Sequence, residues 1–318
     1  MLSSLPSRSR VRAATKENAT YKPLTRPVGL FFGGTSGIGR AMAEELAHQT
    51  NGRAHIILLG RNEEAAKRII AGFPHIEPSA FIPDHEASKY EFIPVDATSM
   101  SNVRDVTHQL LTNHGLEKVN FIVATTGFAS LKSEREETSE GIDRKLACHF
   151  YGRFRFIHDL APLVQKAAEN GETVGVMTIL AAGYGSQVDL NDLGLVKGYT
   201  LGKSTSDIVT YNDAVLERFA QVYPKTRLAH VYPGWVTTPR TSSYPGASVI
   251  NSIFRFANLT PAECAQMLWW RMWTPEEPWR TGAHQINQRG DEIEHNPHVT
   301  KEVRNAVWEH ALEMTRPA

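Results

Sequence analysis

Short apolar runs that alternate with segments of helical period constrain this chain more than any other feature of its sequence. Such runs occur at residues 28–32, 55–59, 91–95, 120–124, 173–179 and 227–232. Several are apolar almost throughout, as strands are when helices cover both faces of a sheet. The spacing leaves room for a helix in each connection, which favours right-handed βαβ units. We therefore predict an α/β fold with a doubly wound parallel sheet of the Rossmann type.

The predicted domain begins after a basic lead-in. Residues 1–26 carry six arginines and lysines against the single acid Glu17, and no apolar signal core follows them. This composition excludes a secretory signal and is compatible with a partly helical lead-in or a mitochondrial presequence. We predict one domain over residues 27–318, with a C-terminal substrate or lid region at about 235–275. Residues 73–89 are expected to form a surface loop, and helices are expected at 260–273 and 300–314.

Composition excludes several classes of function. Lys+Arg and Asp+Glu both number 34, so no charge excess attracts nucleic acid. No apolar run approaches the ~20 residues that span a bilayer. Cys148 and Cys264 lack partners at disulfide or zinc spacing, and we predict no metal site. A cytoplasmic location fits best, and the basic N-terminus leaves the mitochondrial matrix open.

A glycine-rich turn follows the first apolar run and precedes a helical segment. Gly33, Gly37 and Gly39 allow a tight turn, close approach to a pyrophosphate and close helix packing. Between them, Thr35, Ser36 and Ile38 complete the turn at the start of the helix. A glycine turn between a strand and a helix near the start of an α/β chain predicts a dinucleotide site.

The end of the second run indicates which dinucleotide binds. About twenty residues past the glycine turn, an NAD site would place an acid on the ribose 2′-hydroxyl. Arg61 and Asn62 stand there instead, and a guanidinium suits a 2′-phosphate. We therefore predict NADP(H). Asp96, after the third run, either accepts from the adenine amino group or caps the next helix.

Tyr199 and Lys203 are the candidate proton-transfer pair. Their spacing of four predicts one helix face, on which the ammonium would lower the pKa of the phenol from about 10. A phenol tuned in this way can donate a proton near neutral pH.

Together with residues 233–237, Pro-Gly-Trp-Val-Thr, these motifs resemble the short-chain dehydrogenase/reductase superfamily over residues 28–240. Several short segments, among them residues 138–141 and 149–151, resemble a divergent fungal branch of that superfamily, which is often linked with secondary metabolism. The resemblance implies that Tyr199 is the acid/base and that Lys203 binds the nicotinamide ribose. It also implies a homodimer. The cofactor residues that it implies are Gly33, Gly37, Ile38, Gly39, Thr125, Gly127, Pro233, Gly234 and Val236.

The sequence departs from the family pattern at three places. Thr125 stands where the family has an asparagine, and His149 takes the place of a second one, as a core histidine or as a relay group. Leu180 or Ala181 occupies the position of the family serine that binds the substrate carbonyl. Ser186, thirteen residues before Tyr199, is our candidate replacement, with Tyr184 and Thr178 as alternatives.

These observations predict an NADP(H)-dependent oxidoreductase that transfers a hydride to or from a carbonyl or alcohol carbon of a small, apolar metabolite. Loss of one oxyanion-type donor costs on the order of 3 kcal/mol of transition-state stabilisation. The alternative is therefore a catalytically weakened NADP-binding sensor or scaffold protein.

Overall fold

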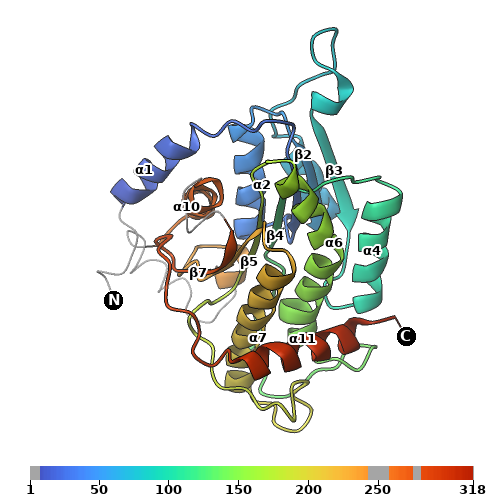
Figure 1. The fold of residues 1–318 in the computed structure, drawn as a ribbon, viewed down its shortest axis with the longest axis vertical. Coiled ribbons are helices and arrows are strands. Elements are labelled where there is room, and N and C mark those ends of the chain that lie inside the picture. Colours follow the sequence, from blue (N-terminus) through green and yellow to red (C-terminus); the bar gives the residue numbers. More distant parts are fainter. Residues whose placement is uncertain (1–7, 243–257, 275–280, 318) are drawn as a thin grey trace.

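The computed structural model describes residues 8–242, 258–274 and 281–317 (Figure 1). At its centre lies one sheet of seven parallel strands in the order β3-β2-β1-β4-β5-β6-β7. This architecture confirms the predicted doubly wound sheet. The strands are β1 (Val28–Phe32), β2 (His55–Gly60), β3 (Lys89–Pro94), β4 (Phe121–Ala124), β5 (Gly175–Ile179), β6 (Arg227–Val231) and β7 (Gly282–Ile286).

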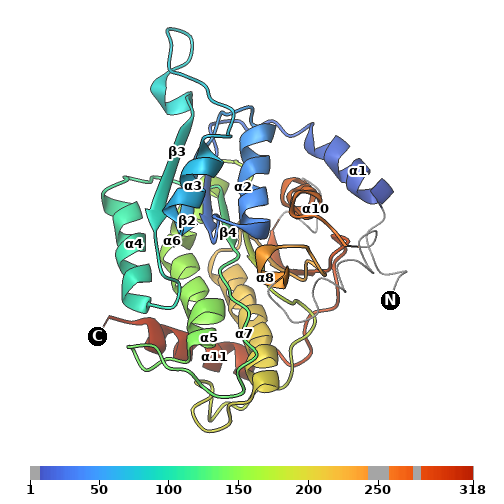
Figure 2. The same cartoon turned by 180° about the vertical axis from the view of Figure 1, so that it is seen from behind.

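Helices cover both faces of the sheet (Figures 1 and 2). One layer holds α4 (Met100–Thr112), α6 (Gly152–Glu169) and α7 (Leu201–Val222), and α11 (Lys301–Thr315) packs on α6 and α7. The other layer holds α2 (Gly37–Gln49), α3 (Glu63–Ile70) and α10 (Pro261–Trp273), and α1 (Arg8–Asn18) packs on α10. Shorter elements are α5 (Arg144–Leu146), α8 (Pro239–Ser242), the 3₁₀ turn η2 (Asp84–Glu86) and the π-helical turn η3 (Ala147–Tyr151).

The first strand shows why its sequence is apolar without alternation. Leu30 and Phe32 are fully buried in the core on the α4–α6–α7 side, whereas Phe31 is fully buried in the core on the α2–α10 side. Successive side chains of a strand point to opposite faces, so a strand covered twice needs apolar residues at every position.

Two C-terminal helices begin and end close to their predicted positions. Thr260 and Glu263 form the predicted capping box at the start of α10. The indole nitrogen of the fully buried Trp269 donates to the Met42 carbonyl at 2.9 Å, which fixes α10 against α2. On the opposite layer, Trp308 of α11 packs edge-on against Phe219 at 4.8 Å between ring centroids.

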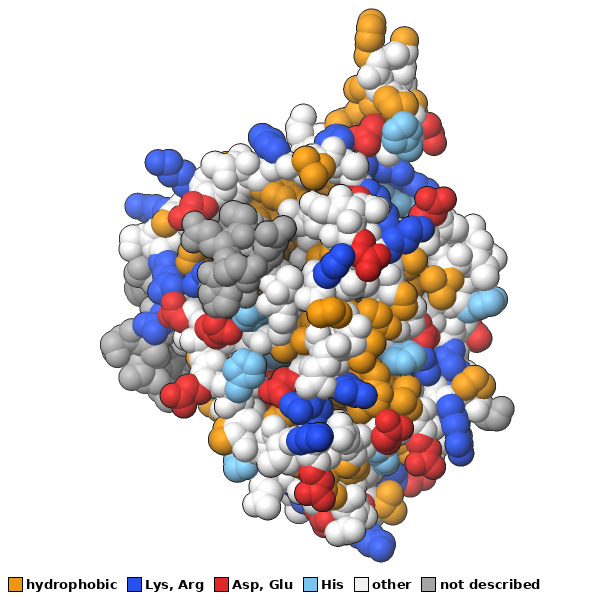
Figure 3. Space-filling model, in the orientation of Figure 1, with side chains coloured by type: hydrophobic (Ala, Val, Ile, Leu, Met, Phe, Trp, Pro, Cys, Tyr) orange, Lys and Arg blue, Asp and Glu red, His pale blue; other side chains and the backbone are white. Residues whose placement is uncertain are grey.

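The predicted surface loop is confirmed. The chain between α3 and β3 projects from the body of the molecule (Figure 1). Hydrophobic side chains lie at the tip of this projection (Figure 3), and Phe81 is 96% exposed there.

The strand order places a crevice at the centre of the sheet. The chain runs outward from β1 through β2 to β3, then returns to β4 on the other side of β1. The loops after β1 and β4 therefore leave the sheet in opposite directions, which opens a binding site at the carboxyl ends of these strands. Within the described residues, no helix is long and apolar enough to cross a membrane.

Candidate active site

A cavity of about 310 Å³ opens at this crevice. It begins at the glycine turn after β1 and extends past the ends of β4, β5 and β6 to the starts of α5 and α7. Its lining residues are Gly33, Ser36, Gly37, Ile38, Thr125, Gly127, Phe128, Ser130, Lys145, His149, Ile179, Leu180, Ala181, Thr205, Ile208, Val209, Pro233, Gly234, Val236, Thr238, Pro239 and Thr241.

The glycine turn is packed so closely that side chains are excluded from it. A Cβ on Gly39 would lie 2.4 Å from Thr125 Oγ1 and 2.5 Å from the Gly33 carbonyl oxygen. Gly33 has φ +102°, a conformation that favours glycine, and its carbonyl accepts a hydrogen bond from Thr125 Oγ1 at 3.1 Å. Thr125 thus holds the turn that the sequence predicts for a dinucleotide.

The start of α2 suits an anionic group. Ser36 is the N-cap residue, but its side chain forms no capping hydrogen bond, so it leaves the first amides of α2 uncapped. Ser36, Gly37 and Ile38 line the cavity, and Gly37 has φ +55°. A Cβ on Gly37 would lie 3.3 Å from Thr238, so the start of α2 and the segment after β6 lie close together at this point. This glycine cradle at a helix N-terminus fits a dinucleotide pyrophosphate.

The residues predicted for the adenosine end are not among those that line the cavity. A Cβ on Gly60 would meet Thr35 Oγ1 at 3.0 Å, so the end of β2 lies against the glycine turn. Arg61, the next residue, is exposed and forms no hydrogen bond or ion pair with a residue that the structure describes. Asn62 caps α3 by accepting from the Ala65 amide at 2.9 Å.

Asp96 lies in the turn after β3. Its Oδ1 accepts from the Thr98 amide at 2.9 Å and from the Thr98 hydroxyl at 2.8 Å. The helix that follows, α4, is capped by Ser99 instead. The expected capping of that helix by Asp96 is therefore wrong, and its contact with adenine stays a prediction.

The segment after β6 closes the other side of the cavity. Pro233, Gly234 and Val236 line it, together with Thr238 and Thr241 near α8, and their contact with a cofactor stays a prediction. Gly234 has φ +71°, and a Cβ there would meet Gln288 Cβ at 3.0 Å. Within the region predicted as a lid, residues 243–257 and 275 lie outside the described residues.

The predicted helix face that joins Tyr199 to Lys203 does not form. Thr200 caps α7 in an extended conformation, and the helix begins at Leu201, so Tyr199 precedes it. Burial raises the pKa of Tyr199, a hydrogen bond from Ser204 partly opposes this effect, and Asp143 and Glu136 raise it further. The expectation that Lys203 lowers this pKa is therefore wrong: an i, i+4 contact needs both residues inside the helix.

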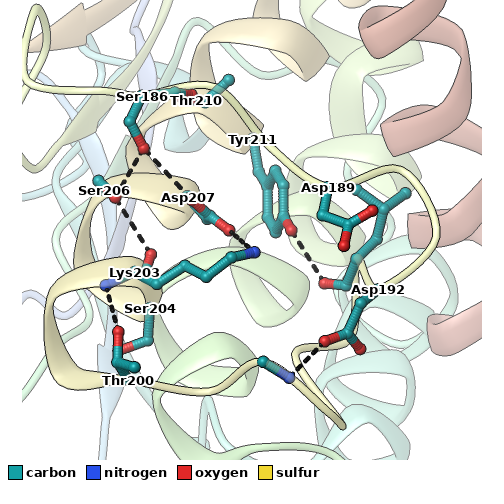
Figure 4. Close-up of polar contacts among 12 residues, drawn as sticks. Ser186, Asp189, Asp192, Thr200, Lys203, Ser204, Ser206, Asp207, Thr210 and Tyr211 are labelled. Carbon is teal, nitrogen blue, oxygen red and sulfur yellow. Dashed lines mark hydrogen bonds and ion pairs between the residues drawn. The ribbon is translucent and has the colours of Figure 1, made fainter.

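Lys203 and Ser186 belong to one cluster beside the cavity rather than to its lining (Figure 4). The Lys203 ammonium contacts Asp207 Oδ2 at 3.1 Å, and the Asp207 side chain is fully buried. Ser186 donates to Ser206 Oγ at 2.8 Å and contacts Asp207 Oδ1 at 3.4 Å. Because the Thr210 hydroxyl also donates to the Ser186 carbonyl at 2.7 Å, this cluster ties the loop after β5 to α7.

The loop after β5 presents apolar groups where the resemblance predicts a serine. Leu180 and Ala181 line the cavity. Tyr184, one candidate replacement, is 62% exposed and packs on Tyr232. Thr178, the other, is buried and accepts a hydrogen bond from Arg153 at 2.7 Å. Neither they nor Ser186 stand among the lining residues. The hydroxyl side chains that do line the cavity belong to Ser36, Thr125, Ser130, Thr205, Thr238 and Thr241.

His149 is a buried histidine whose two ring nitrogens contact the backbone. Its Nε2 accepts from the Phe128 amide at 3.2 Å, so Nδ1 donates to the Lys145 carbonyl at 3.0 Å. This arrangement matches the core-histidine interpretation, although one side of the residue lines the cavity.

Two important residues were missed by the sequence reasoning. Lys145, only 8% exposed, reaches the cavity from α5. Arg153 of α6 is 1% exposed and donates to Thr178 Oγ1, to the Ile179 carbonyl and to the Thr126 carbonyl, so it joins the ends of β4 and β5. For Arg153 the available signal was a basic residue among apolar helical positions, whereas Lys145 follows Asp143 and Arg144 and carries no such signal.

Comparison with known proteins gives consistent matches. The family described as short chain dehydrogenase matches residues 28–187. The oxidoreductase andH of Emericella variicolor is 30% identical over 235 residues, which are 74% of this chain and 64% of that protein. An oxidoreductase of Emericella nidulans is 30% identical over 236 residues, 74% of this chain and 66% of that one. This chain thus spans slightly less than two thirds of either relative.

Solved structures agree on the fold. The RhlG/NADP active-site complex of Pseudomonas aeruginosa superposes with a TM-score of 0.58 at 17% identity and covers 83% of this chain and 95% of its own. A hydroxysteroid dehydrogenase from Escherichia coli gives 0.59 at 14% identity and covers 87% and 99%.

Proposed function

Because this chain belongs to the short-chain dehydrogenase family and has fungal oxidoreductases among its relatives, we propose that it is an NADP(H)-dependent carbonyl reductase or alcohol dehydrogenase. A pyridine-nucleotide oxidoreductase is what the family supports; the choice of NADP(H) and the substrate are our proposal. The observation that carries it is the continuous cavity from the glycine turn to Pro233 and Gly234 at the carboxyl ends of the strands.

The substrate that this cavity favours is small and apolar. Phe128, Leu180, Ile208 and Val209 are among the residues that line it. Apolar walls with a few polar groups are typical of sites that orient a small metabolite by one oxygen. A ketone, aldehyde or secondary alcohol with an aliphatic or aromatic body fits this lining.

The chain supplies the cofactor seat and the proton. The nicotinamide, when bound, supplies or accepts the hydride. Gly33, Gly37 and Thr125 would hold the pyrophosphate, and Pro233 and Gly234, which line the same cavity, would contact the nicotinamide. We assign Tyr199 as the proton donor in reduction. Its ring lies close to the cavity, because the ammonium of the cavity residue Lys145 is 5.9 Å from the ring centroid.

Lys203 can bind the nicotinamide ribose, and Ser186 the substrate carbonyl, only if their contacts with Asp207 and Ser206 break. In the structure both side chains are held by that cluster. A role in secondary metabolism, a location in the cytoplasm or mitochondrial matrix, and a homodimeric state also remain predictions.

Arg61 is the residue that we assign to the 2′-phosphate. Its exposed guanidinium follows the strand end that packs on Thr35. Arg61→Ala should lower the ratio of NADPH to NADH affinity about tenfold or more, because a charge-assisted hydrogen bond is worth about 1.5–3 kcal/mol. Isothermal titration with both cofactors measures the ratio, with Arg68→Ala on α3 as the matched control. An unchanged ratio would show that another group selects the cofactor.

The alternative function is a nucleotide-binding sensor or scaffold. It is favoured by one observation: the side chains that line the cavity beside β5 are Ile179, Leu180 and Ala181, which supply no hydroxyl to a substrate oxygen. Such a protein would bind NADPH and turn over no carbonyl compound.

NADPH oxidation with a panel of ketones, aldehydes and quinones tests the two functions. We expect turnover with an apolar carbonyl compound, and a drop of about a hundredfold or more in kcat for Tyr199→Phe. Tyr223→Phe, at the far end of α7, should leave kcat unchanged. Binding of NADPH without any turnover favours the sensor, and equal activity of Tyr199→Phe removes the role that we assign to the phenol.

A further inference from the structure

A second cavity, of about 360 Å³, is lined by residues of α11, of the turn η3, of the segment before α5 and of the loop that precedes α7. Its volume lies within the range of about 300–1,000 Å³ that small-molecule sites have. Much of its lining is apolar, and the apolar side chains are Ile142, Leu190, Leu193, Val196 and Met314. The exposed Val196 gives solvent access to it on the side of the loop.

The segment α5–η3 separates this cavity from the candidate active site. Lys145 of α5 lines the cavity at the glycine turn, whereas Asp143, two residues earlier, lines the second cavity. In η3, His149 lines the first cavity and Tyr151 lines the second. Among the residues that the structure describes, none lines both. An occupant of the second cavity is therefore distinct from the cofactor and the substrate of the proposed function.

Hydrogen bonds within the protein hold the loop side of the second cavity in place. Asp192 accepts from the Val196 amide and from the Gly198 amide, both at 2.7 Å. The Tyr211 hydroxyl donates to the Leu193 carbonyl at 3.0 Å (Figure 4). A ligand therefore does not have to order this loop, and binding to an ordered site has a smaller entropic cost.

Gly194 leaves room in the cavity opposite His310. A Cβ on Gly194 would lie 3.5 Å from Val196 Cγ2 and 4.0 Å from His310 Cε1, and both are ordinary contact distances. The φ of Gly194 lies outside the positive range, so neither the backbone nor crowding requires a glycine there. Because Gly194 and His310 both line the cavity, a longer side chain at position 194 would reach into it.

His310 offers one hydrogen-bond donor to an occupant. Its Nε2 contacts the hydroxyl of the buried Tyr151 at 2.8 Å. Burial raises the pKa of Tyr151 and lowers the pKa of His310, so at neutral pH the phenol keeps its proton and the imidazole is neutral. Within the part of the chain that the structure describes, neither side chain has another hydrogen-bond partner. If Tyr151 donates to Nε2, only Nδ1–H is left without a partner, whereas the other tautomer leaves two such groups.

The charged groups that line the cavity already have partners or face water. Arg135 forms an ion pair with Glu137. Asp143 and Asp192 each accept hydrogen bonds from three backbone amides. Lys197 is exposed. A charged ligand would lose hydration here without gaining a buried counter-charge, so the lining favours a neutral occupant.

From this geometry we propose that the second cavity binds a neutral, mainly apolar molecule whose carbonyl oxygen accepts a hydrogen bond from His310 Nδ1. The apolar side chains of the lining enclose the body of this molecule, and the imidazole fixes its orientation. Apolar walls with a few precisely placed polar groups are the usual composition of a small-molecule site. With one hydrogen bond and a small apolar body, the dissociation constant should lie in the millimolar range.

Fluorine NMR tests this site with the para-fluoro derivative of N,N-diethylbenzamide. This probe has an apolar body, one carbonyl acceptor and no hydrogen-bond donor, and a tertiary amide does not accept a hydride from a nicotinamide. Titration with the full chain follows the width of the fluorine line and gives the dissociation constant. The measurement needs neither turnover nor cofactor, so its outcome is independent of the proposed function.

Two variants should weaken binding to different extents. We expect Gly194→Leu to weaken it tenfold or more, because the new side chain occupies the space of the probe. His310→Phe keeps an aromatic ring but removes the donor, so it should weaken binding about fivefold. Gly202→Leu is the matched control, since a Cβ on Gly202 meets nothing within 4 Å. It should bind the probe like wild type.

The remaining outcomes would overturn the proposal. No binding by the wild-type protein does so, and so does binding that Gly194→Leu leaves unchanged, because the probe then lies elsewhere. Wild-type affinity in His310→Phe rejects the hydrogen bond. Tighter binding of para-fluorobenzoate than of the amide rejects the neutral class of ligand.

Second variants cover loss of folding, which the melting temperature reports. If Gly194→Leu does not fold, Val196→Trp fills the cavity from a position that is 66% exposed, and it should weaken binding as strongly. His310→Phe leaves the Tyr151 hydroxyl without its acceptor. If this variant does not fold, the double variant Tyr151→Phe/His310→Phe removes both polar groups, which costs less stability than leaving one unpaired. Wild-type affinity in either replacement variant overturns the proposal.

Discussion

Replacing Gly39 by alanine tests whether the glycine turn is the cofactor seat. The added Cβ would lie 2.4 Å from Thr125 Oγ1 and 2.5 Å from the Gly33 carbonyl oxygen, whereas ordinary carbon contacts lie at about 3.5–4.0 Å. The Thr125 side chain can rotate, but the Gly33 carbonyl is backbone. The turn between β1 and α2 must therefore move, and overpacking of this kind costs about 1–3 kcal/mol.

That strain should appear in both stability and affinity. A loss of about 1–3 kcal/mol in binding raises the dissociation constant of NADPH about 5- to 150-fold. The same strain should lower the melting temperature by about 2–4 °C for each kcal/mol. Fluorescence titration with NADPH and calorimetric unfolding measure the two quantities.

Gly202→Ala provides the control for Gly39→Ala. Gly202 lies in the first turn of α7, and a Cβ there meets nothing within 4 Å. This variant should keep its NADPH affinity and gain at most about 1 kcal/mol of stability from helix propensity. Adding Thr125→Ala to Gly39→Ala removes one of the two closest contacts, so it should restore affinity only in part. A Gly39→Ala protein with wild-type affinity and melting temperature would refute the idea that this close packing shapes the seat.

Two further predictions concern stability. Arg153→Met removes the buried guanidinium that joins β4 to β5 and leaves the Ile179 and Thr126 carbonyl groups without this donor. The free energy of unfolding in urea should therefore fall by about 1–3 kcal/mol for each carbonyl left unsatisfied. A loss below about 1 kcal/mol in total would contradict this account. A hydrogen bond from His55 lowers the pKa of Glu91 to about 2 from its ordinary value near 4.5. Because the folded value is the lower one, this stabilisation is complete above about pH 5 and is lost as the pH falls toward 2. Glu91→Gln should therefore flatten the acid limb of the stability profile, and an unchanged limb would show that other carboxyl groups dominate it.

The pattern of apolar runs predicts every strand of the sheet except one. The six apolar runs lie between helical segments, and each contains or overlaps a strand of the sheet. The seventh strand, β7, was missed because its sequence includes His284 and Gln285 and lies at the edge of the sheet. Both side chains are nevertheless buried, and His284 Nδ1 contacts Glu292 Oε1 at 2.7 Å. A polar strand that owes its burial to tertiary contacts gives no apolar signal in the sequence.

The glycine turn could be predicted because local geometry determines it. Gly33 and Gly37 need positive φ, and a Cβ on Gly39 would meet the backbone. Because glycine satisfies a positive φ and a lack of space for a Cβ better than other residues do, these positions can be recognised from a single sequence. Lys145 shows the opposite case: its approach to the cavity depends on the packing of α5 against α7, over a separation of 59 residues to Ser204.

The Tyr199 and Lys203 spacing shows why a motif needs its helix boundary. The spacing of four predicts contact only if both residues have helical backbone, and Thr200 ends that possibility by capping α7 with its own side chain. Lys203 then has Asp207 as its neighbour one turn further along, and that contact satisfies the same i, i+4 rule. The predicted Tyr199–Lys203 contact is therefore wrong, and Lys203 pairs with Asp207 instead. The cation that lies over the Tyr199 ring comes from another element instead: the Lys145 ammonium of α5 is 5.9 Å from the ring centroid.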